Sequence, residues 1–150
     1  PALTGLGCPN GIAWFRPALA DFIDSLSRRV DLWSVNALSG EFVEVVDQLD
    51  LGVFAGLPDG LAIDAEGRLW VAFWGGGAVR AFNRDGSIHV TIKVGTPLVS
   101  SVCFGGSDLS TLFITTAVDT SQSPPDSDAG LLFACRPGAS GRPPFLWNQG

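Results

Sequence analysis

Three short segments of this 150-residue chain share one pattern, and they begin 49 and 41 residues apart, at residues 9–14, 58–63 and 99–104. Each segment is followed by a second apolar run with the composition of a strand. Periods of about 40–50 residues with several short strands per repeat are typical of the blades of a β-propeller. The repeat therefore predicts an all-β fold in which similar small sheets are arranged around an axis.

The strand pattern within each repeat predicts four strands, and it is clearest in the middle repeat. Strands are predicted there over residues 60–64, 68–74, 78–83 and 87–94. The flanking strands are predicted over residues 10–14, 20–25, 29–36, 41–47, 99–104, 111–117 and 130–135. We therefore expect one partial propeller domain over residues 1–150, of about three four-stranded blades with the last one incomplete. The blades are expected at about residues 9–50, 51–97 and 98–150.

Composition excludes several other classes of protein. Glycine and proline occupy 29 of 150 positions, which excludes long helices and coiled coils, and it makes the amphipathic stretch 18–29 a strand and turn. The net charge of −6, with Arg28-Arg29 as the only adjacent basic pair, argues against nucleic acid and anionic membranes as partners and favours a cation.

No uncharged apolar stretch reaches 18 residues, so no membrane span is expected. Residues 1–6 show no secretion signal, which favours a cytoplasmic location.

The three cysteines are odd in number, far apart in the chain and outside any Cys-x-x-Cys motif. This spacing of Cys8, Cys103 and Cys135 argues against a disulfide framework and against a thiolate zinc site. We therefore expect all three to be small buried apolar residues.

Oxygen-bearing side chains recur at one position of the repeat. The alignment places Asn10, Asp59 and Ser100 at the same point of the first strand in successive units, where side chains from different blades converge on a central channel. In the first two units a glycine follows, which lets another backbone approach closely. Carboxylate and amide oxygens in such a channel suit a hard cation such as calcium. The alternative is that Asn-Gly and Asp-Gly are turn dipeptides that precede strands.

Other polar residues indicate structural roles. His89 is the only histidine and has no nucleophile motif beside it, so we expect a surface residue. The glycines of residues 74–77 are not followed by Gly-Lys-Ser/Thr, and they predict a tight hairpin rather than a phosphate loop. Asp24 and Asp64 each close a predicted strand, and both are expected to cap turns.

The sequence resembles the gluconolactonase/regucalcin (senescence marker protein) family over about residues 5–135, in particular over residues 9–14, 22–31, 57–76, 100–106, 112–117 and 131–134. The resemblance implies a six-bladed propeller with one divalent metal in its channel, which hydrolyses sugar lactones and related esters. The family's metal ligands include the Asn of Asn-Gly-Ile and the Asp of Asp-Gly-Leu, which fall on Asn10 and Asp59. The resemblance also makes Asp59 the candidate catalytic base. Calcium is the first metal implied, with zinc, manganese and magnesium as alternatives.

The chain also departs from the family pattern. A six-bladed ring takes roughly 250–300 residues at this repeat length, and no position here matches the family's further Glu ligand or its substrate-contacting Asn and Arg residues. One hypothesis is the carboxy-terminal half of a metal-dependent hydrolase of lactones. The alternative is a non-catalytic propeller fragment that acts as a binding or structural module. A third expectation is self-association of two copies through open blade edges.

Overall fold

Strands make up nearly all the regular structure of the chain, which a computed structural model describes for residues 1–121 and 126–143. The elements in order are β1 (Pro9–Arg16), β2 (Leu19–Asp24), η1 (Ser25–Ser27), β3 (Arg29–Val35), β4 (Phe42–Asp50), β5 (Leu57–Ile63), β6 (Leu69–Trp74), β7 (Ala78–Phe82), β8 (Ile88–Lys93), β9 (Val99–Gly105), β10 (Thr111–Thr116) and β11 (Leu132–Cys135). None of the helices in the described ranges has the length and hydropathy that a membrane crossing requires.

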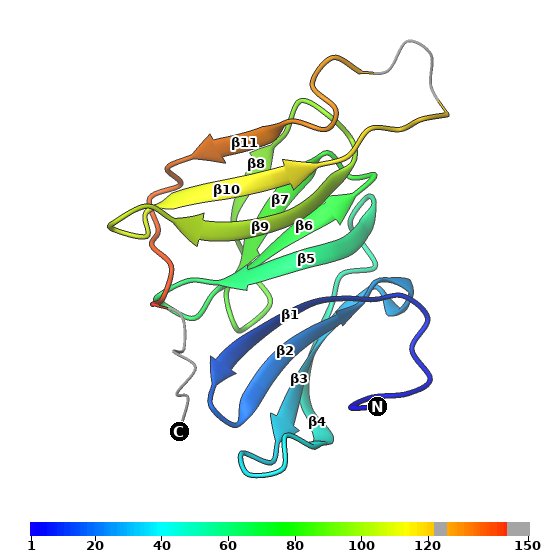
Figure 1. The fold of residues 1–150 in the computed structure, drawn as a ribbon, viewed down its shortest axis with the longest axis vertical. Helices are drawn as coiled ribbons and strands as arrows, with labels where there is room; N and C mark the ends of the chain where they lie inside the picture. Colours follow the sequence, from blue (N-terminus) through cyan, green and yellow to red (C-terminus); the bar gives the residue numbers. More distant parts are fainter. Residues whose placement is uncertain (122–125, 144–150) are drawn as a thin grey trace.

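The strands form three antiparallel sheets, each built from strands consecutive in the chain (Figure 1). The first sheet has the order β1-β2-β3-β4, the second β5-β6-β7-β8, and the third β9-β10-β11. The predicted partial propeller is therefore confirmed, and within the described residues the third sheet has three strands. The hairpin expected at residues 74–77 is also confirmed, because Gly75 and Gly77 turn the chain from β6 to β7 with φ of 76° and 59°, a region that favours glycine.

The first strands of the three sheets meet at the centre of the fan, where β1 packs against β5 and β5 packs against β9. Glycine makes this close approach feasible. A Cβ atom at Gly11 would lie 2.7 Å from the carbonyl oxygen of Asp59, and one at Gly60 would lie 2.7 Å from the Cα atom of Ser101. Both glycines lie inside strands, at irregularities in the β1–β2 and β5–β6 pairing, and neither has a positive φ. The interpretation of Asn-Gly and Asp-Gly as turn dipeptides is therefore wrong.

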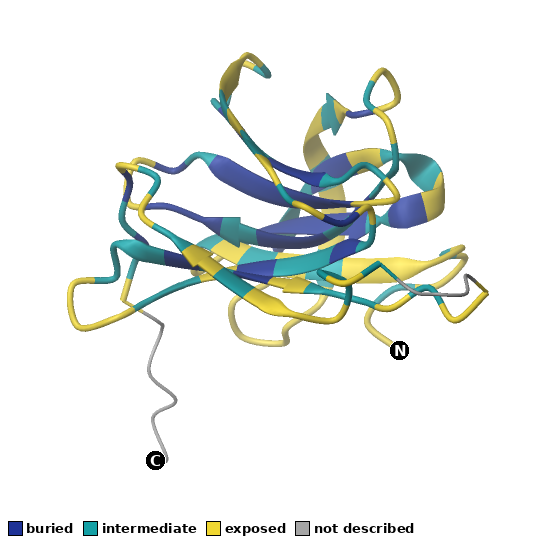
Figure 2. Cartoon of the chain, turned by 90° about the horizontal axis from the view of Figure 1, so that it is seen from above, coloured by how far each residue is buried: buried dark blue, intermediate teal, exposed yellow. Residues whose placement is uncertain are grey.

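Two apolar layers fill the spaces between neighbouring sheets, and Figure 2 shows the buried residues concentrated along the central strands. The layer between the first and second sheets contains Ile23, Val30, Leu61, Ile63, Val71, Phe73 and Phe82. The layer between the second and third sheets contains Trp70, Ala72, Val79, Ala81, Val102, Leu112 and Ile114. The second sheet therefore buries both its faces, because successive side chains of a strand point to opposite sides.

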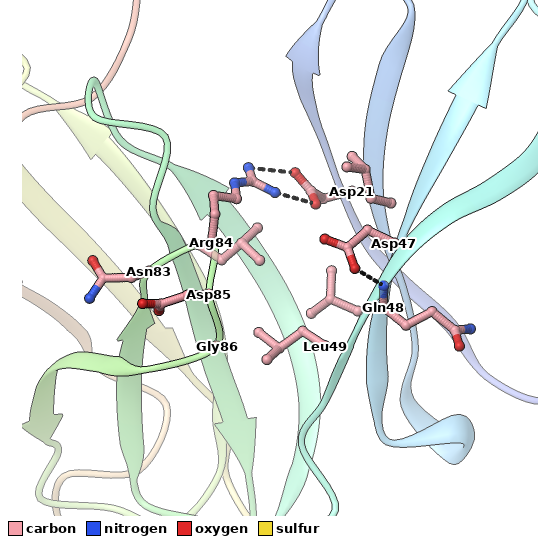
Figure 3. A pocket seen from close by; sticks show the side chains of 11 residues that line it. Asp21, Asp47, Gln48, Leu49, Asn83, Arg84, Asp85 and Gly86 are labelled. Atoms are coloured by element: carbon pink, nitrogen blue, oxygen red, sulfur yellow. Dashed lines mark hydrogen bonds and ion pairs between the residues drawn. The ribbon is translucent and has the colours of Figure 1, made fainter.

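One ion pair joins the first sheet to the second at the edge of the apolar layer (Figure 3). The guanidinium of Arg84 donates to both carboxylate oxygens of Asp21, at 2.8 and 2.9 Å. It also donates from Nε to the Gly67 carbonyl, and it stacks 4.0 Å from the centre of the Phe15 ring. The Asp21 side chain is 1% exposed, and burial raises its pKa although Arg84 opposes that effect. The cavity of about 170 Å³ that Asp21 and Arg84 line does not include Asn10 or Asp59 in its lining.

We expect Arg84→Met to lower the free energy of unfolding at pH 7 by about 3–5 kcal/mol, because the change leaves the buried Asp21 carboxylate unpaired. The double variant Asp21→Leu/Arg84→Met should recover most of that loss, since it removes both charges. Because burial already raises the folded-state pKa of Asp21, protonation favours the folded state. The loss in Arg84→Met should therefore shrink as the pH falls toward the range in which Asp21 protonates. Urea unfolding across pH checks this, and a pH-independent loss would contradict it.

A second expectation concerns the contact between β5 and β9. Gly60→Ala should cost about 1–3 kcal/mol of stability, because its Cβ would be forced against the backbone of Ser101. The matched control is Gly52→Ala, whose Cβ meets only the end of the Asp50 side chain. Thermal unfolding of both variants compares the two sites, and equal losses would show that the central contact is not tight.

Candidate functional site

A cavity of about 280 Å³ opens where the first and second sheets meet near the centre of the fan. It is lined by Cys8, Asn10, Ser25, Leu57, Asp59 and Trp74. Asn10 lies on β1 and Asp59 on β5, so the close packing of these two strands brings their side chains to one cavity. The structure thus places the two residues as the sequence alignment expects.

The Asn10 side chain is oriented by a chain of two hydrogen bonds. Its Nδ2 donates to the hydroxyl of Ser25 at 2.8 Å, and that hydroxyl donates in turn to the carbonyl oxygen of Pro58 at 2.6 Å. Ser25 is buried, and it directly follows β2, whose last residue pairs with Pro9. Since the amide nitrogen is engaged with the protein, the Oδ1 atom of Asn10 remains for another partner. Ser25 therefore links one candidate ligand to the strand that carries the other.

Asp24 fixes the segment that leads into β1. Its carboxylate accepts hydrogen bonds from the backbone N–H groups of Gly7 at 2.8 Å and Cys8 at 2.7 Å, and it caps η1 through the N–H of Leu26. The bonds from Gly7 and Cys8 hold the pKa of Asp24 below its usual value. Asp24 is thus a turn-capping carboxylate, as expected.

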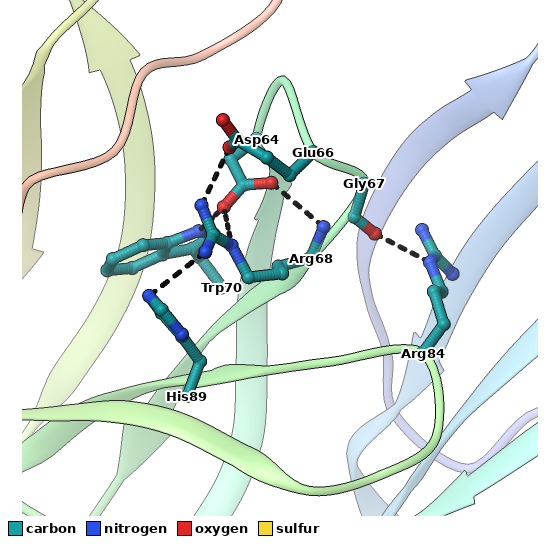
Figure 4. A network of polar contacts seen from close by, with 7 residues as sticks. All are labelled: Asp64, Glu66, Gly67, Arg68, Trp70, Arg84 and His89. Atoms are coloured by element: carbon teal, nitrogen blue, oxygen red, sulfur yellow. Dashed lines mark hydrogen bonds and ion pairs between the residues drawn. The ribbon is translucent and has the colours of Figure 1, made fainter.

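Asp64 is likewise structural, although it follows the same strand as Asp59 (Figure 4). Its buried carboxylate accepts from the backbone N–H and Nε of Arg68 and from the indole N–H of Trp70. Arg68 also pairs with Glu66 and lies 3.0 Å from Nε2 of the exposed His89. The predicted surface position of His89 is confirmed, and both carboxylate oxygens of Asp64 are engaged in the fold.

Asp59 differs from these two carboxylates. In the part of the chain that the structure describes, no hydrogen bond or ion pair reaches its side chain, although the residue is partly buried. Burial raises its pKa above the ordinary aspartate value. A partly desolvated carboxylate without a partner is available to bind a cation or to accept a proton.

Two sequence expectations need correction here. Ser100 does not line the cavity, and its hydroxyl instead lies 2.8 Å from that of Thr115. The cysteines are not all buried, because Cys8 and Cys103 are exposed and Cys135 is only partly covered. Cys8 precedes β1 at the cavity, and Cys103 lies on a face of the third sheet that no other described sheet covers. All three cysteines are free in this structure.

Ser25 is the residue that the sequence analysis did not find. The signal available for it was the predicted hairpin of residues 10–14 and 20–25, since an antiparallel pairing returns the end of the second strand to the start of the first. Its hydroxyl has no motif of its own, so only the pairing register could have indicated its place beside Asn10.

The donor set of the cavity fits a divalent cation in part. Asn10 offers an amide oxygen, and Asp59 offers an unpartnered carboxylate, which are ligands that calcium and magnesium accept. Among the residues described, however, no group of three His, Cys, Asp or Glu side chains gathers at any point. If the cavity holds a cation, Asn10 and Asp59 would supply only part of its ligand shell, and the remaining ligands would have to come from water or from outside the described residues.

A fan of consecutive antiparallel sheets, with the first strands at its centre, defines a β-propeller segment, here with a cavity between its first two central strands. The chain belongs to the SMP-30/gluconolactonase/LRE-like family, whose model matches residues 2–118. It is 35% identical to a pentonolactonase of Haloferax volcanii, with 95% of this chain and 52% of that protein covered. It is 38% identical to regucalcin of Xenopus laevis, with 73% and 38% covered.

Solved structures show the same relationship. Regucalcin from Agrobacterium tumefaciens, described as a calcium-binding protein, superimposes with a TM-score of 0.78 at 29% identity. The superposition covers 94% of this chain and 50% of that one. The chain thus spans about half the length of the curated relatives it matches.

We expect Ser25→Ala to destabilise the protein by about 1–3 kcal/mol, because it removes the hydroxyl that satisfies both the Asn10 amide and the Pro58 carbonyl. Ser100→Ala is the matched control, since the Ser100 hydroxyl makes a hydrogen bond with the hydroxyl of Thr115, and this pair is exposed. Urea unfolding measures both variants. A loss in Ser25→Ala no larger than that in Ser100→Ala would show that the hydrogen-bond chain does not hold the site.

Proposed function

We propose that this chain contributes the metal-binding centre of a lactone- or ester-hydrolysing enzyme, and that it corresponds to the carboxy-terminal half of such a protein. The observation that carries the proposal is the pairing of Asn10 with the unpartnered, partly buried Asp59 in one cavity at the propeller centre. Family membership supports the reaction class, since relatives are named as a pentonolactonase and a gluconolactonase.

In the proposed reaction, water adds to the lactone carbonyl carbon, the ring C–O bond breaks, and a hydroxy acid is released. Asp59 acts as the general base that accepts a proton from the water and returns it to the leaving oxygen. Burial that raises the pKa of Asp59 makes it a stronger base than an exposed aspartate. Asn10 would bind the cation through its Oδ1 atom, because its Nδ2 atom donates to the hydroxyl of Ser25.

Asn10 and Asp59 would together hold a divalent cation, with calcium first and zinc, manganese or magnesium as alternatives. When bound, such a cation supplies Lewis acidity that polarises the substrate carbonyl. The exposed indole of Trp74 and the side chain of Leu57 line the same cavity and would contact the substrate's apolar surface.

A second candidate function is a non-catalytic binding or structural module. The specific observation in its favour is the small number of ligands, since Asn10 and Asp59 are the only side chains described as lining this cavity whose oxygen atoms remain for a cation, and no group of three His, Cys, Asp or Glu side chains gathers among the described residues. This candidate predicts weak cation binding without turnover, whereas the enzyme proposal requires turnover that depends on the cation.

The enzyme proposal predicts hydrolysis of gluconolactone by the purified chain in the presence of calcium, zinc, manganese or magnesium. Asp59→Asn should abolish that rate, and it should weaken calcium binding about tenfold or more, which is about 1.4 kcal/mol. Asn10→Ala should weaken binding less, because it removes a neutral ligand. Isothermal titration calorimetry and a pH-stat assay provide the two measurements.

The matched control is Asp50→Asn on β4, an exposed carboxylate that does not line the cavity. It should leave both the affinity and the rate unchanged. A cation-dependent rate that survives Asp59→Asn would remove Asp59 from the mechanism. Cation binding with no turnover of any lactone would favour the binding module.

A further inference from the structure

Ser25 carries a buried hydroxyl group whose two hydrogen bonds both lead to the candidate site. The residue is 3% exposed, and it lines the cavity that contains Asn10 and Asp59. Its Oγ atom lies 2.8 Å from Nδ2 of Asn10 and 2.6 Å from the carbonyl oxygen of Pro58. That carbonyl belongs to the peptide bond between Pro58 and Asp59. One hydroxyl therefore joins the side chain of one candidate ligand to the backbone of the other.

The direction of these two hydrogen bonds follows from what each group can donate. A carbonyl oxygen carries no proton, so the single proton of the Ser25 hydroxyl points to Pro58. The Ser25 oxygen then offers only lone pairs to Asn10, and the NH2 group is the only part of that side chain that can donate to them. The opposite orientation of the amide would set two acceptor oxygens against each other. The Oδ1 atom of Asn10 therefore lies on the side of the amide that faces away from Ser25.

The equivalent position in the other two sheets carries no hydroxyl group. In the register of the three first hairpins, Ser25, Trp74 and Ala117 each follow the residue that pairs with the start of the central strand. Trp74 lines the cavity beside Asp59, whose carboxylate has two equivalent oxygens and needs no such orientation. The hydroxyl thus occurs in the unit whose candidate ligand, Asn10, is an amide with two different ends.

The backbone that leads to Asn10 is held separately from its side chain. The Asp24 carboxylate accepts hydrogen bonds from the N–H groups of Gly7 and Cys8. The backbone N–H of Ser25 donates to the carbonyl of Cys8 at 2.9 Å. None of these bonds uses the Ser25 hydroxyl. Because the terminal torsion of asparagine has broad preferences, loss of that hydroxyl would let the Asn10 amide turn while the strand stays in place.

We infer that Ser25 is a positioning residue, which fixes the Asn10 amide so that its oxygen, and not its NH2 group, is presented to a cation in the cavity. The part of this inference that concerns the cation rests on the proposed function, whereas the orientation of the amide does not. An NH2 group turned toward a cation opposes binding, because its hydrogen atoms carry partial positive charge. Only molecules with the oxygen presented bind well, so the apparent affinity falls with the fraction of molecules in that orientation.

The experiment is a calcium titration of the full chain followed by nitrogen–proton NMR, which detects weak as well as tight binding. Ser25→Ala should weaken calcium binding about threefold to tenfold, because the orienting hydrogen bond is lost. In the Asn10→Asp background the same change should alter the affinity by less than about twofold, since both oxygens of a carboxylate can accept the cation. The matched control is Ser27→Ala, which should leave the affinity unchanged. The Ser27 hydroxyl donates to the Asp24 carbonyl in the same turn and does not line the cavity.

Equal weakening by Ser25→Ala in both backgrounds, or no weakening in either, overturns the inference. If the unmodified chain binds no calcium, the proposed function fails, and the orientation is decided by the same spectra. The NH2 signals of Asn10, identified by their loss in Asn10→Asp, should show nuclear Overhauser contacts with the β protons of Ser25. The absence of these contacts from the unmodified chain overturns the inference without any cation, and this measurement also decides the matter if Ser25→Ala does not fold.

Discussion

The close packing of β1 on β5 and of β5 on β9 is the contact on which the rest of this structure depends. Gly11 and Gly60 permit it, because any side chain at either position would meet the backbone of the next strand. The sheets fan out from these contacts, and the space between them is filled by the two apolar layers. The same contact brings Asn10 and Asp59 to one cavity, so the fold and the candidate site share one cause.

The carboxylates of the chain differ in whether the fold gives them hydrogen-bond partners. Asp21, Asp24 and Asp64 are each engaged by two or more donors, and each joins segments that are distant or that turn sharply. The Asp59 side chain is partly buried, but among the described residues no donor forms a hydrogen bond with it. Burial without a partner raises free energy unless a ligand compensates for it, which is the physical reason to look for function at Asp59 rather than at its neighbours.

Much of the fold could be predicted from the sequence, because strand alternation and the spacing of the repeat are local properties. The strands predicted at residues 29–36 and 111–117 match β3 and β10 closely. The roles of side chains were harder to predict where they depend on packing between sheets. Ser100 aligned with Asn10 and Asp59 but lies outside their cavity, and Cys103 is exposed because no described sheet covers its face. Neither position can be predicted from the sequence around the residue, because both depend on how the sheets pack.

The small number of ligands at the candidate site follows from the architecture. In a propeller, each sheet contributes one central strand, and an axial site collects what those strands supply. Among the three described sheets, the central strands β1 and β5 bring Asn10 and Asp59 to one cavity, whereas Ser100 on β9 lies outside it. If the cavity holds a cation as we propose, these two side chains would supply only part of the six to eight oxygen ligands that calcium takes.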